Sequence, residues 1–194
     1  MKTLVIHPDD PSTENLKAVY QNIQNCTVIT GGVSVAFVHQ QIIKHDRVIM
    51  LGHGTSLGLL AMGNFTDDTV EVNEDGYSYV PLYVVDESSV AALSKKQNNI
   101  YIWCYASDYV KAFGLKGFCS GMYISELMEA YLMGIDDQTH ESIEAQFKHF
   151  CELVGTVAEK SAREMYNYVR TEYGKGIDRC PITKYNHERL WVAE

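Results

Sequence analysis

The sequence predicts an α/β protein, a three-layer sandwich in which helices cover both faces of a mostly parallel sheet. Short apolar runs alternate with helix-like segments along most of the 194 residues. Each run is short enough to be a buried strand, and a hydrophobic content of 46% is sufficient for a sizeable core. Because parallel strands need crossover connections, the strand-helix-strand rhythm at the start implies helices on both faces of the sheet.

The first half of the chain is expected to supply three strands, with a helix after each of the first two. The strands are expected at residues 4–7, 26–30 and 47–51, and the helices at residues 13–23 and 33–45. The first helix is indicated by Leu16, Val19, Tyr20 and Ile23, whose spacing places them on one helical face. These elements form two consecutive crossover units of a parallel sheet.

A small β-hairpin insertion is expected after the third strand. The stretch VEVNEDGYSYV, residues 70–80, alternates around an Asp-Gly pair that is typical of a hairpin turn. Tyr77, Tyr79 and Tyr83 alternate, so they share a face that either covers the core or lines a groove. Asp86 then predicts the N-terminus of a helix at residues 88–96.

The second half of the chain resumes the α/β pattern. Strands are expected at residues 100–103 and 117–123, helices at 108–115, 125–132 and about 138–173, and an edge strand at 190–192. Gly134 is the predicted end of the helix before it. Since no linker or repeat divides the chain, residues 1–194 are expected to form one domain, with the C-terminal helices packed on it.

Composition argues against several functions. The net charge is −9 with 16 basic residues, and no stripe of Lys and Arg is present, so nucleic acid is not an expected partner. A basic substrate or partner suits this charge better. No apolar run approaches the roughly 18 residues that a membrane helix requires, and no membrane association is expected.

Cysteine and histidine spacing gives no sign of a metal or of a disulfide framework. The five cysteines are odd in number and widely spaced, without a CxxC pair. A reducing compartment is the simplest interpretation, so a soluble cytoplasmic protein is expected. The histidines have no metal-ligand spacing, and Gly31-Gly32 lacks the framing of a nucleotide-binding loop, so no cofactor is expected.

Two expected strands end in residues that can carry chemistry. His53 follows VIMLG and is flanked by glycines, and Cys104 follows YIW. In a parallel sheet, such strand ends meet at one edge, where a Cys–His pair can attack an acyl carbon. Alternatively, Cys104 is a small core residue, and His53 is a histidine that only satisfies a turn. Cys119, within an expected strand, is better explained as core.

The order of these features resembles the caspase-like cysteine peptidase superfamily, clan CD, and is closest to its CHAT-type domains. The resemblance rests on the HG pair after a strand, a hairpin, VVDESSVAAL before the next strand, a Cys followed by small or hydroxyl residues, and AFGLKGFCSGMYISELMEA. It implies a caspase-like sheet and a hydrolase in which His53 is the general base and Cys104 the nucleophile. The backbone N–H groups of Gly54 and Cys104 would form the oxyanion hole. The position before the nucleophile departs from the family, because Trp103 stands where members commonly have a small residue.

Substrate binding is assigned to Trp103, Asp67 and Asp68. The two aspartates begin an acidic run that is either a solvated loop or a border of the cleft that favours Lys or Arg beside the scissile bond. Two functions therefore stay open. One is a cysteine peptidase that cleaves a peptide or protein substrate through a thioester. The other is a non-catalytic caspase-like scaffold, favoured by Trp103, that binds a protein partner or small ligand in the same crevice. The sequence leaves the oligomeric state open.

Overall fold

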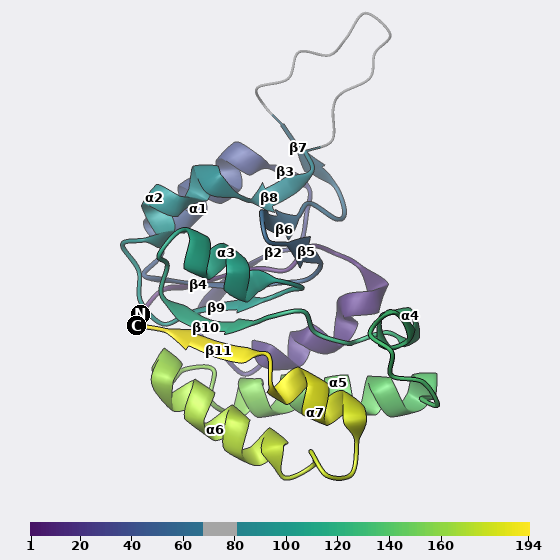
Figure 1. Cartoon of the computed structure of the whole chain (residues 1–194). Helices are drawn as coiled ribbons and strands as arrows, with labels where there is room; N and C mark the ends of the chain where they lie inside the picture. The colour runs from purple at the N-terminus through teal and green to yellow at the C-terminus, as the bar shows by residue number, and fades with distance from the viewer. Residues whose placement is uncertain (68–80) are drawn as a thin grey trace, which may run out of the picture.

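A six-stranded sheet forms the centre of the computed structural model, which describes residues 1–67 and 81–194 (Figure 1). Its strands are β1 (Thr3–Ile6), β2 (Cys26–Ile29), β4 (Arg47–Leu51), β9 (Asn99–Ile102), β10 (Gly117–Ser120) and β11 (Leu190–Ala193). They lie in the order β11-β10-β9-β4-β1-β2. Every neighbouring pair is parallel except β10 with β11, which is antiparallel at the edge. The predicted mostly parallel α/β sheet is therefore confirmed.

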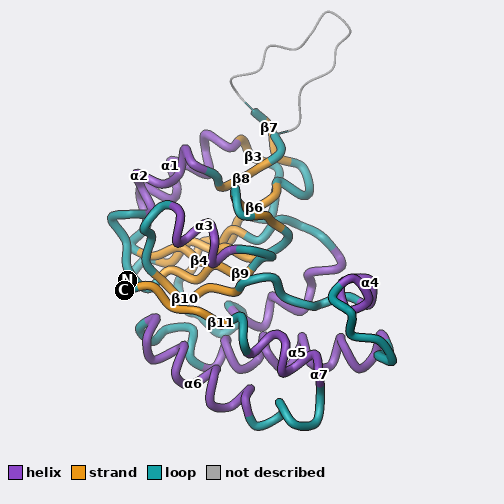
Figure 2. Tube along the Cα trace, in the orientation of Figure 1, coloured by secondary structure: helices purple, strands orange, loops and turns teal. Residues whose placement is uncertain are grey.

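Helices cover both faces of this sheet. They are η1 (Pro11–Val19, a 3-10 helix), α1 (Val35–Lys44), η2 (Glu87–Ser89, also 3-10), α2 (Val90–Leu93), α3 (Ala106–Ala112), α4 (Leu127–Leu132), α5 (His140–Thr156), α6 (Ala162–Gly174) and α7 (Pro181–His187). Figures 1 and 2 show α1, α2 and α3 on one face and α5, α6 and α7 on the other. This arrangement is the predicted three-layer sandwich.

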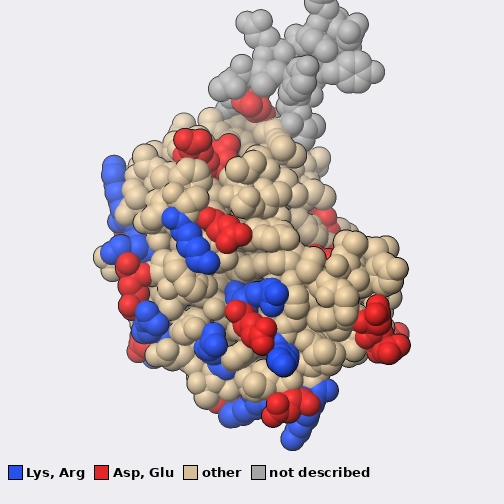
Figure 3. Space-filling view, viewed as in Figure 1, with Lys and Arg blue, Asp and Glu red and all other residues tan. Residues whose placement is uncertain are grey.

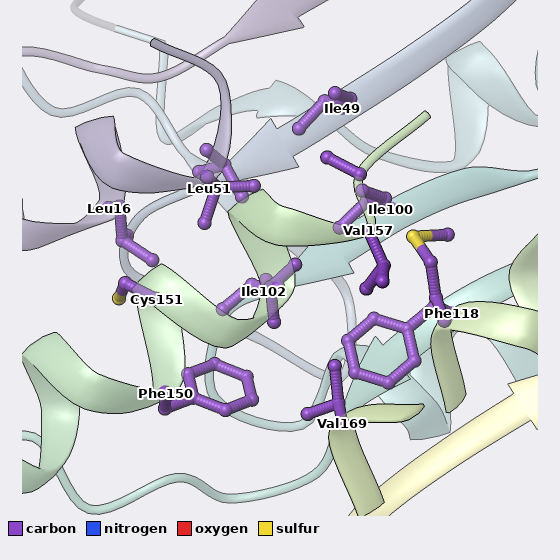
Figure 4. Packing of buried hydrophobic residues seen from close by; sticks show 14 of the residues in the cluster. Leu16, Ile49, Leu51, Ile100, Ile102, Phe118, Phe150, Cys151, Val157 and Val169 are labelled. Atoms are coloured by element: carbon purple, nitrogen blue, oxygen red, sulfur yellow. The ribbon is translucent and has the colours of Figure 1, made fainter. Parts of the chain in front are cut away.

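Strand alternation divides the core into two layers. Val5, Ile49 and Ile100 face η1, α5 and α6, in a cluster with Phe150 and Val169 (Figure 4). Successive side chains of a strand point to opposite faces, so the residues next to these three belong to the other layer. There they pack against α1, α2 and α3. Both layers are closed to solvent, which explains why the central strands read as continuous apolar runs rather than as alternating ones.

Short strands complete the layer that contains α1 and α2. The strands β3 (Val33–Ser34) and β7 (Phe65–Thr66) form a parallel pair. An antiparallel sheet contains β5 (Gly54–Thr55), β6 (Gly58–Leu60) and β8 (Tyr83–Val85). The hairpin predicted at residues 70–80 lies outside the described residues, and so do Tyr77 and Tyr79.

Several helices differ in extent from the sequence-based prediction. The first is a 3-10 helix that ends at Val19, before Ile23. The predicted segment at 138–173 is two helices, α5 and α6, because Ser161 begins a second helix with a reciprocal capping box to Glu164. Helix α7 was not predicted. Its proline occupies the first turn of the helix, where a missing N–H is tolerated.

Within the described ranges, no helix is both long and apolar enough to cross a bilayer.

Candidate functional site

His53 and Cys104 leave the same edge of the sheet from neighbouring strands. Leu51, the last residue of β4, pairs with Ile102, the last residue of β9. The N–H of Gly52 still donates to the carbonyl of Ile102 across 3.1 Å. His53 and Cys104 each lie two positions beyond that paired level, and neighbouring strands are roughly 4.8 Å apart. The predicted juxtaposition of these two strand ends is therefore present.

The two glycines that flank His53 are required for different reasons. Gly52 has a φ of 139°, a backbone conformation that side chains with a Cβ rarely adopt. Gly54 is required by packing, since a Cβ there would lie 2.1 Å from Cδ1 of Trp103 and 2.6 Å from the carbonyl oxygen of Gly58. The turn that displays His53 is thus shaped by its own backbone and by the residue that precedes Cys104.

The imidazole of His53 contacts a residue that the sequence did not single out. Its Nε2 lies 2.7 Å from Oγ of Ser12, at the start of η1. Ser12 Oγ in turn donates to Oδ1 of Asp10 across 2.7 Å, and the backbone N–H of Ser12 donates to the same oxygen across 2.8 Å. The bonds from Ser12 and the positive charge that His53 can carry lower the pKa of Asp10. Asp10 therefore stays ionised beside the histidine.

The thiol of Cys104 is half-buried and lies between two acceptors. Sγ is 3.7 Å from the carbonyl oxygen of Tyr123 and 3.6 Å from Oε1 of Glu129. Burial raises the pKa of the thiol to about 12, and the negative charge of Glu129 contributes to the increase. In this arrangement Cys104 is a protonated thiol at neutral pH.

The residue after Cys104 makes the sharp turn from strand to helix. Tyr105 has a φ of 68°, an uncommon conformation for a residue that is not glycine, and it immediately precedes α3. Non-glycine residues with such backbone angles cluster at functional sites, because only the surrounding structure holds them there. The turn carries Cys104 out of the buried strand.

Trp103 has a packing position rather than a contact with the cleft. Its side chain is only 2% exposed and packs against the rings of Tyr101 and Tyr109. Its indole N–H donates to the carbonyl of Thr55 across 2.9 Å. Substrate binding was predicted for Trp103, but in this conformation the buried side chain cannot touch a substrate directly. It instead supports the His53 loop by packing against Gly54.

The carboxylate beside Cys104 is Glu129, which the sequence-based reasoning missed. Of the predicted substrate carboxylates, Asp67 follows β7 in the layer of α1 and α2, and Asp68 lies outside the described residues. Glu129 occupies the first turn of α4, where Oε2 accepts from the N–H groups of Ser125 and Glu126. A capping box was the only local signal of this residue, and it indicates a helix start rather than contact with a cysteine 25 positions away.

A cleft of about 570 Å³ lies beside the hydrogen-bonding neighbours of His53 and Cys104. It is bordered on one side by Ser12, which contacts His53, and on the other by Ser125, which contacts Glu129. Its other lining residues include three carboxylates: Glu14, Glu126 and Glu144. Helix α4 separates this cleft from a second, apolar hollow of about 600 Å³, and Figure 3 shows few charged side chains over this helix.

Two other residues of types that can carry catalysis, His7 directly after β1 and Cys119 in β10, are buried away from solvent. His7 is 3% exposed between Tyr20 and Thr13, each 3.1 Å from a ring nitrogen. Cys119 is fully buried within β10, as expected of a core residue. All five cysteines are free. Over residues 1–67 and 81–194, no group of three or more His, Cys, Asp or Glu side chains is arranged to hold a metal ion.

Fold and site together define an α/β protein with a histidine and a cysteine at adjacent strand ends. Comparisons with models of known protein families and with curated protein sequences gave no match. The geometry of the strand ends therefore carries the functional proposal.

Proposed function

We propose that the protein is a cysteine peptidase that uses His53 and Cys104 as a catalytic dyad. The observation that carries the proposal is the register of β4 and β9, which brings the two residues to one edge of the sheet at the same level. The positive φ of Tyr105 and the adjoining cleft add support, because a displayed nucleophile needs both a sharp turn and room for a substrate.

His53 acts as the general base in this reaction. It takes the proton of the Cys104 thiol while the sulfur attacks the carbonyl carbon of a peptide bond, and the backbone N–H groups of Gly54 and Cys104 stabilise the oxyanion. The C–N bond then breaks, and His53 returns the proton to the departing amine, which leaves a thioester on Cys104. Water, activated by His53, hydrolyses the thioester and restores the thiol.

The raised thiol pKa determines when the proton moves. A thiol with a pKa of about 12 is protonated at neutral pH, so a resting thiolate–imidazolium pair is not formed. His53 must therefore remove the proton during the attack on substrate. A substrate that displaces the carboxylate of Glu129 from Cys104 would assist the transfer, because it removes a negative charge beside the developing thiolate.

Carboxylates around the cleft favour substrates with Lys or Arg near the scissile bond. Glu129 contacts the nucleophile, and Glu14, Glu126 and Glu144 line the adjoining cleft. A cationic side chain in this region would gain charge-assisted contacts. The net charge of −9 adds a field of the same sign, although salt screens its long-range part within roughly 8 Å at physiological ionic strength.

Labelling with peptidyl acyloxymethyl ketones tests this proposal. Probes with Lys, Leu or Asp at the residue next to the reactive group are compared at pH 7.5. Labelling is expected to favour the Lys probe, to disappear in Cys104→Ala and to fall about a hundredfold or more in His53→Ala. The variants Cys119→Ala and His39→Ala serve as matched controls and should label like the unmodified protein. Labelling that survives Cys104→Ala would reject the assignment.

A non-catalytic scaffold is the second candidate, and the state of the Cys104 thiol favours it. The thiol is protonated and held between Tyr123 and Glu129, as in a cysteine with only a structural role. The same cleft would then bind a basic peptide without cleaving it. Equal labelling of native and His53→Ala protein, together with saturable binding of a Lys-rich peptide, would support this alternative over the peptidase.

A further inference from the structure

Three adjacent strands of the sheet bring three loops to the candidate site. The order β9-β4-β1 places the strand before His53 between the strand before Cys104 and the strand before Ser12. Ile6, at the end of β1, pairs with Met50 of β4, so the loop after β1 leaves from the same edge. The histidine therefore has the nucleophile on one side and a polar loop on the other.

The hydrogen bonds of Ser12 Oγ determine which ring nitrogen of His53 carries the proton. A serine hydroxyl has one hydrogen, and Ser12 Oγ gives it to Oδ1 of Asp10 across 2.7 Å. Ser12 Oγ is then an acceptor toward His53, which must place its proton on Nε2 to make the 2.7 Å contact. In the neutral ring this tautomer leaves the lone pair on Nδ1, where a proton from a thiol can be received.

The local sequence holds Ser12 in place. Asp10 is the N-cap of η1, and Pro11 at the first helical position has a restricted φ. The carboxylate of Asp10 accepts from both the backbone and the side chain of Ser12, so the hydroxyl has little freedom to rotate away. The hydroxyl is thereby aimed at the imidazole.

We propose that Ser12 and Asp10 are positioning residues, which hold His53 in the Nε2–H tautomer and fix the orientation of its ring. The role in tautomer selection stands on the hydrogen bonds alone. The catalytic consequence rests on the proposed peptidase function.

The chain contains a matched control for this arrangement. Asp86 and Ser88 repeat the same cap at the start of η2, where Oδ1 of Asp86 accepts from the N–H of Ser88 at 2.9 Å and from its Oγ at 2.6 Å. No histidine contact accompanies Ser88 among the hydrogen bonds of the described residues. Ser88→Ala therefore removes an equivalent capping hydroxyl without touching His53.

The test is a long-range ¹H–¹⁵N correlation spectrum of protein with ¹⁵N-labelled histidine at pH 7.5, which separates protonated from unprotonated ring nitrogens. His53, assigned by loss of its signals in His53→Ala, is expected as the Nε2–H tautomer in the native protein, in Ser88→Ala and in Ser12→Thr, which keeps a hydroxyl. Ser12→Ala is expected to give a mixture of tautomers. Thermal unfolding of Ser12→Ala and Ser88→Ala checks that both variants fold.

An Nδ1–H tautomer in the native protein, or a spectrum that Ser12→Ala leaves unchanged, would overturn the inference and reduce Asp10 and Ser12 to a helix cap. The rate of Cys104 labelling provides a separate readout. Ser12→Ala should lower it about tenfold to a hundredfold, with Ser12→Thr restoring most of it. A tautomer change without a rate change would overturn the catalytic part alone. Absence of labelling in the native protein would instead count against the peptidase proposal and leave the tautomer result intact.

Discussion

Cys104 Sγ lies 3.6 Å from Oε1 of Glu129, so the candidate nucleophile has a carboxylate as its neighbour. The same carboxylate caps α4 through Oε2, which accepts from Ser125 and Glu126. One side chain thus connects the start of a helix to the protonation state of a thiol.

Glu129→Gln is expected to lower the pKa of the Cys104 thiol and to speed its alkylation. The substitution removes a negative charge while keeping an oxygen that can cap α4. The pKa should remain above its usual value, since burial is the largest cause of the increase. Each unit by which the pKa falls raises the thiolate fraction about tenfold. The measurement is the pH dependence of iodoacetamide reaction at Cys104, with Glu152→Gln on α5 as a control. An unchanged or higher midpoint in Glu129→Gln would contradict the role of this charge.

Gly54→Ala is expected to destabilise the protein by about 3 kcal/mol and to disturb the His53 loop. The added Cβ meets both the ring of Trp103 and a backbone oxygen, and overpacking of this kind typically costs about 1–3 kcal/mol. Gly134→Ala is the control, because open space surrounds that position and only its φ of 71° opposes a side chain. Chemical denaturation compares the two variants. An equal loss of stability in Gly54→Ala and Gly134→Ala would show that the Trp103 ring can shift to accommodate the added Cβ without a free-energy penalty.

His7 is expected to make stability fall between neutral and acid pH. Burial is the largest cause that lowers its pKa from 6.5 to about 4, so the unfolded chain binds more protons across this range. The contribution of His7 to the free energy of unfolding is therefore fully present above pH 6.5. It is lost as the pH falls toward 4, and the loss amounts to roughly 3 kcal/mol. In denaturant titrations at pH 4 to 7.5, His7→Gln should remove this part of the slope, whereas the exposed control His140→Gln should keep it. A slope that is the same in His7→Gln and the native protein would exclude His7 as its source.

Asn186→Ala is expected to lower the free energy of unfolding by about 3 kcal/mol. The buried amide of Asn186 accepts from the N–H of Ile124 at 2.8 Å and donates to its carbonyl at 2.9 Å. Its loss leaves two buried backbone groups unpaired, at about 1–3 kcal/mol each. Because Tyr123 adjoins this clamp, the contact of its carbonyl with Cys104 should loosen as well. Asn167→Ala, an exposed change on α6, is the control in the same denaturation experiment. A similarly small loss of stability in Asn186→Ala and Asn167→Ala would refute a stabilising role for the hydrogen bonds between Asn186 and Ile124.

Local pattern was enough to predict most of the sheet. The apolar run at 47–51 is β4 with the predicted bounds, and the edge strand at the C-terminus differs by one residue. Such runs are readable because a strand buried on both faces must be apolar at nearly every position. Helix α7 was missed, since a short helix with a proline in its first turn has little periodicity to detect.

The sequence by itself determined that His53 and Cys104 closely follow two strands of one parallel sheet, because hydrophobic runs mark where strands stop and the crossover rule aligns their ends. Only the tertiary structure decided what surrounds them. Ser12 reaches His53 across 41 positions and Glu129 reaches Cys104 across 25, and the burial of Trp103 depends on Gly54 in another loop. These contacts are set by how loops and helices pack after the sheet has formed. Hydrophobic periodicity along the chain cannot predict these contacts. It indicates which face of a helix or strand is buried, but not which side chain of another element packs against that face.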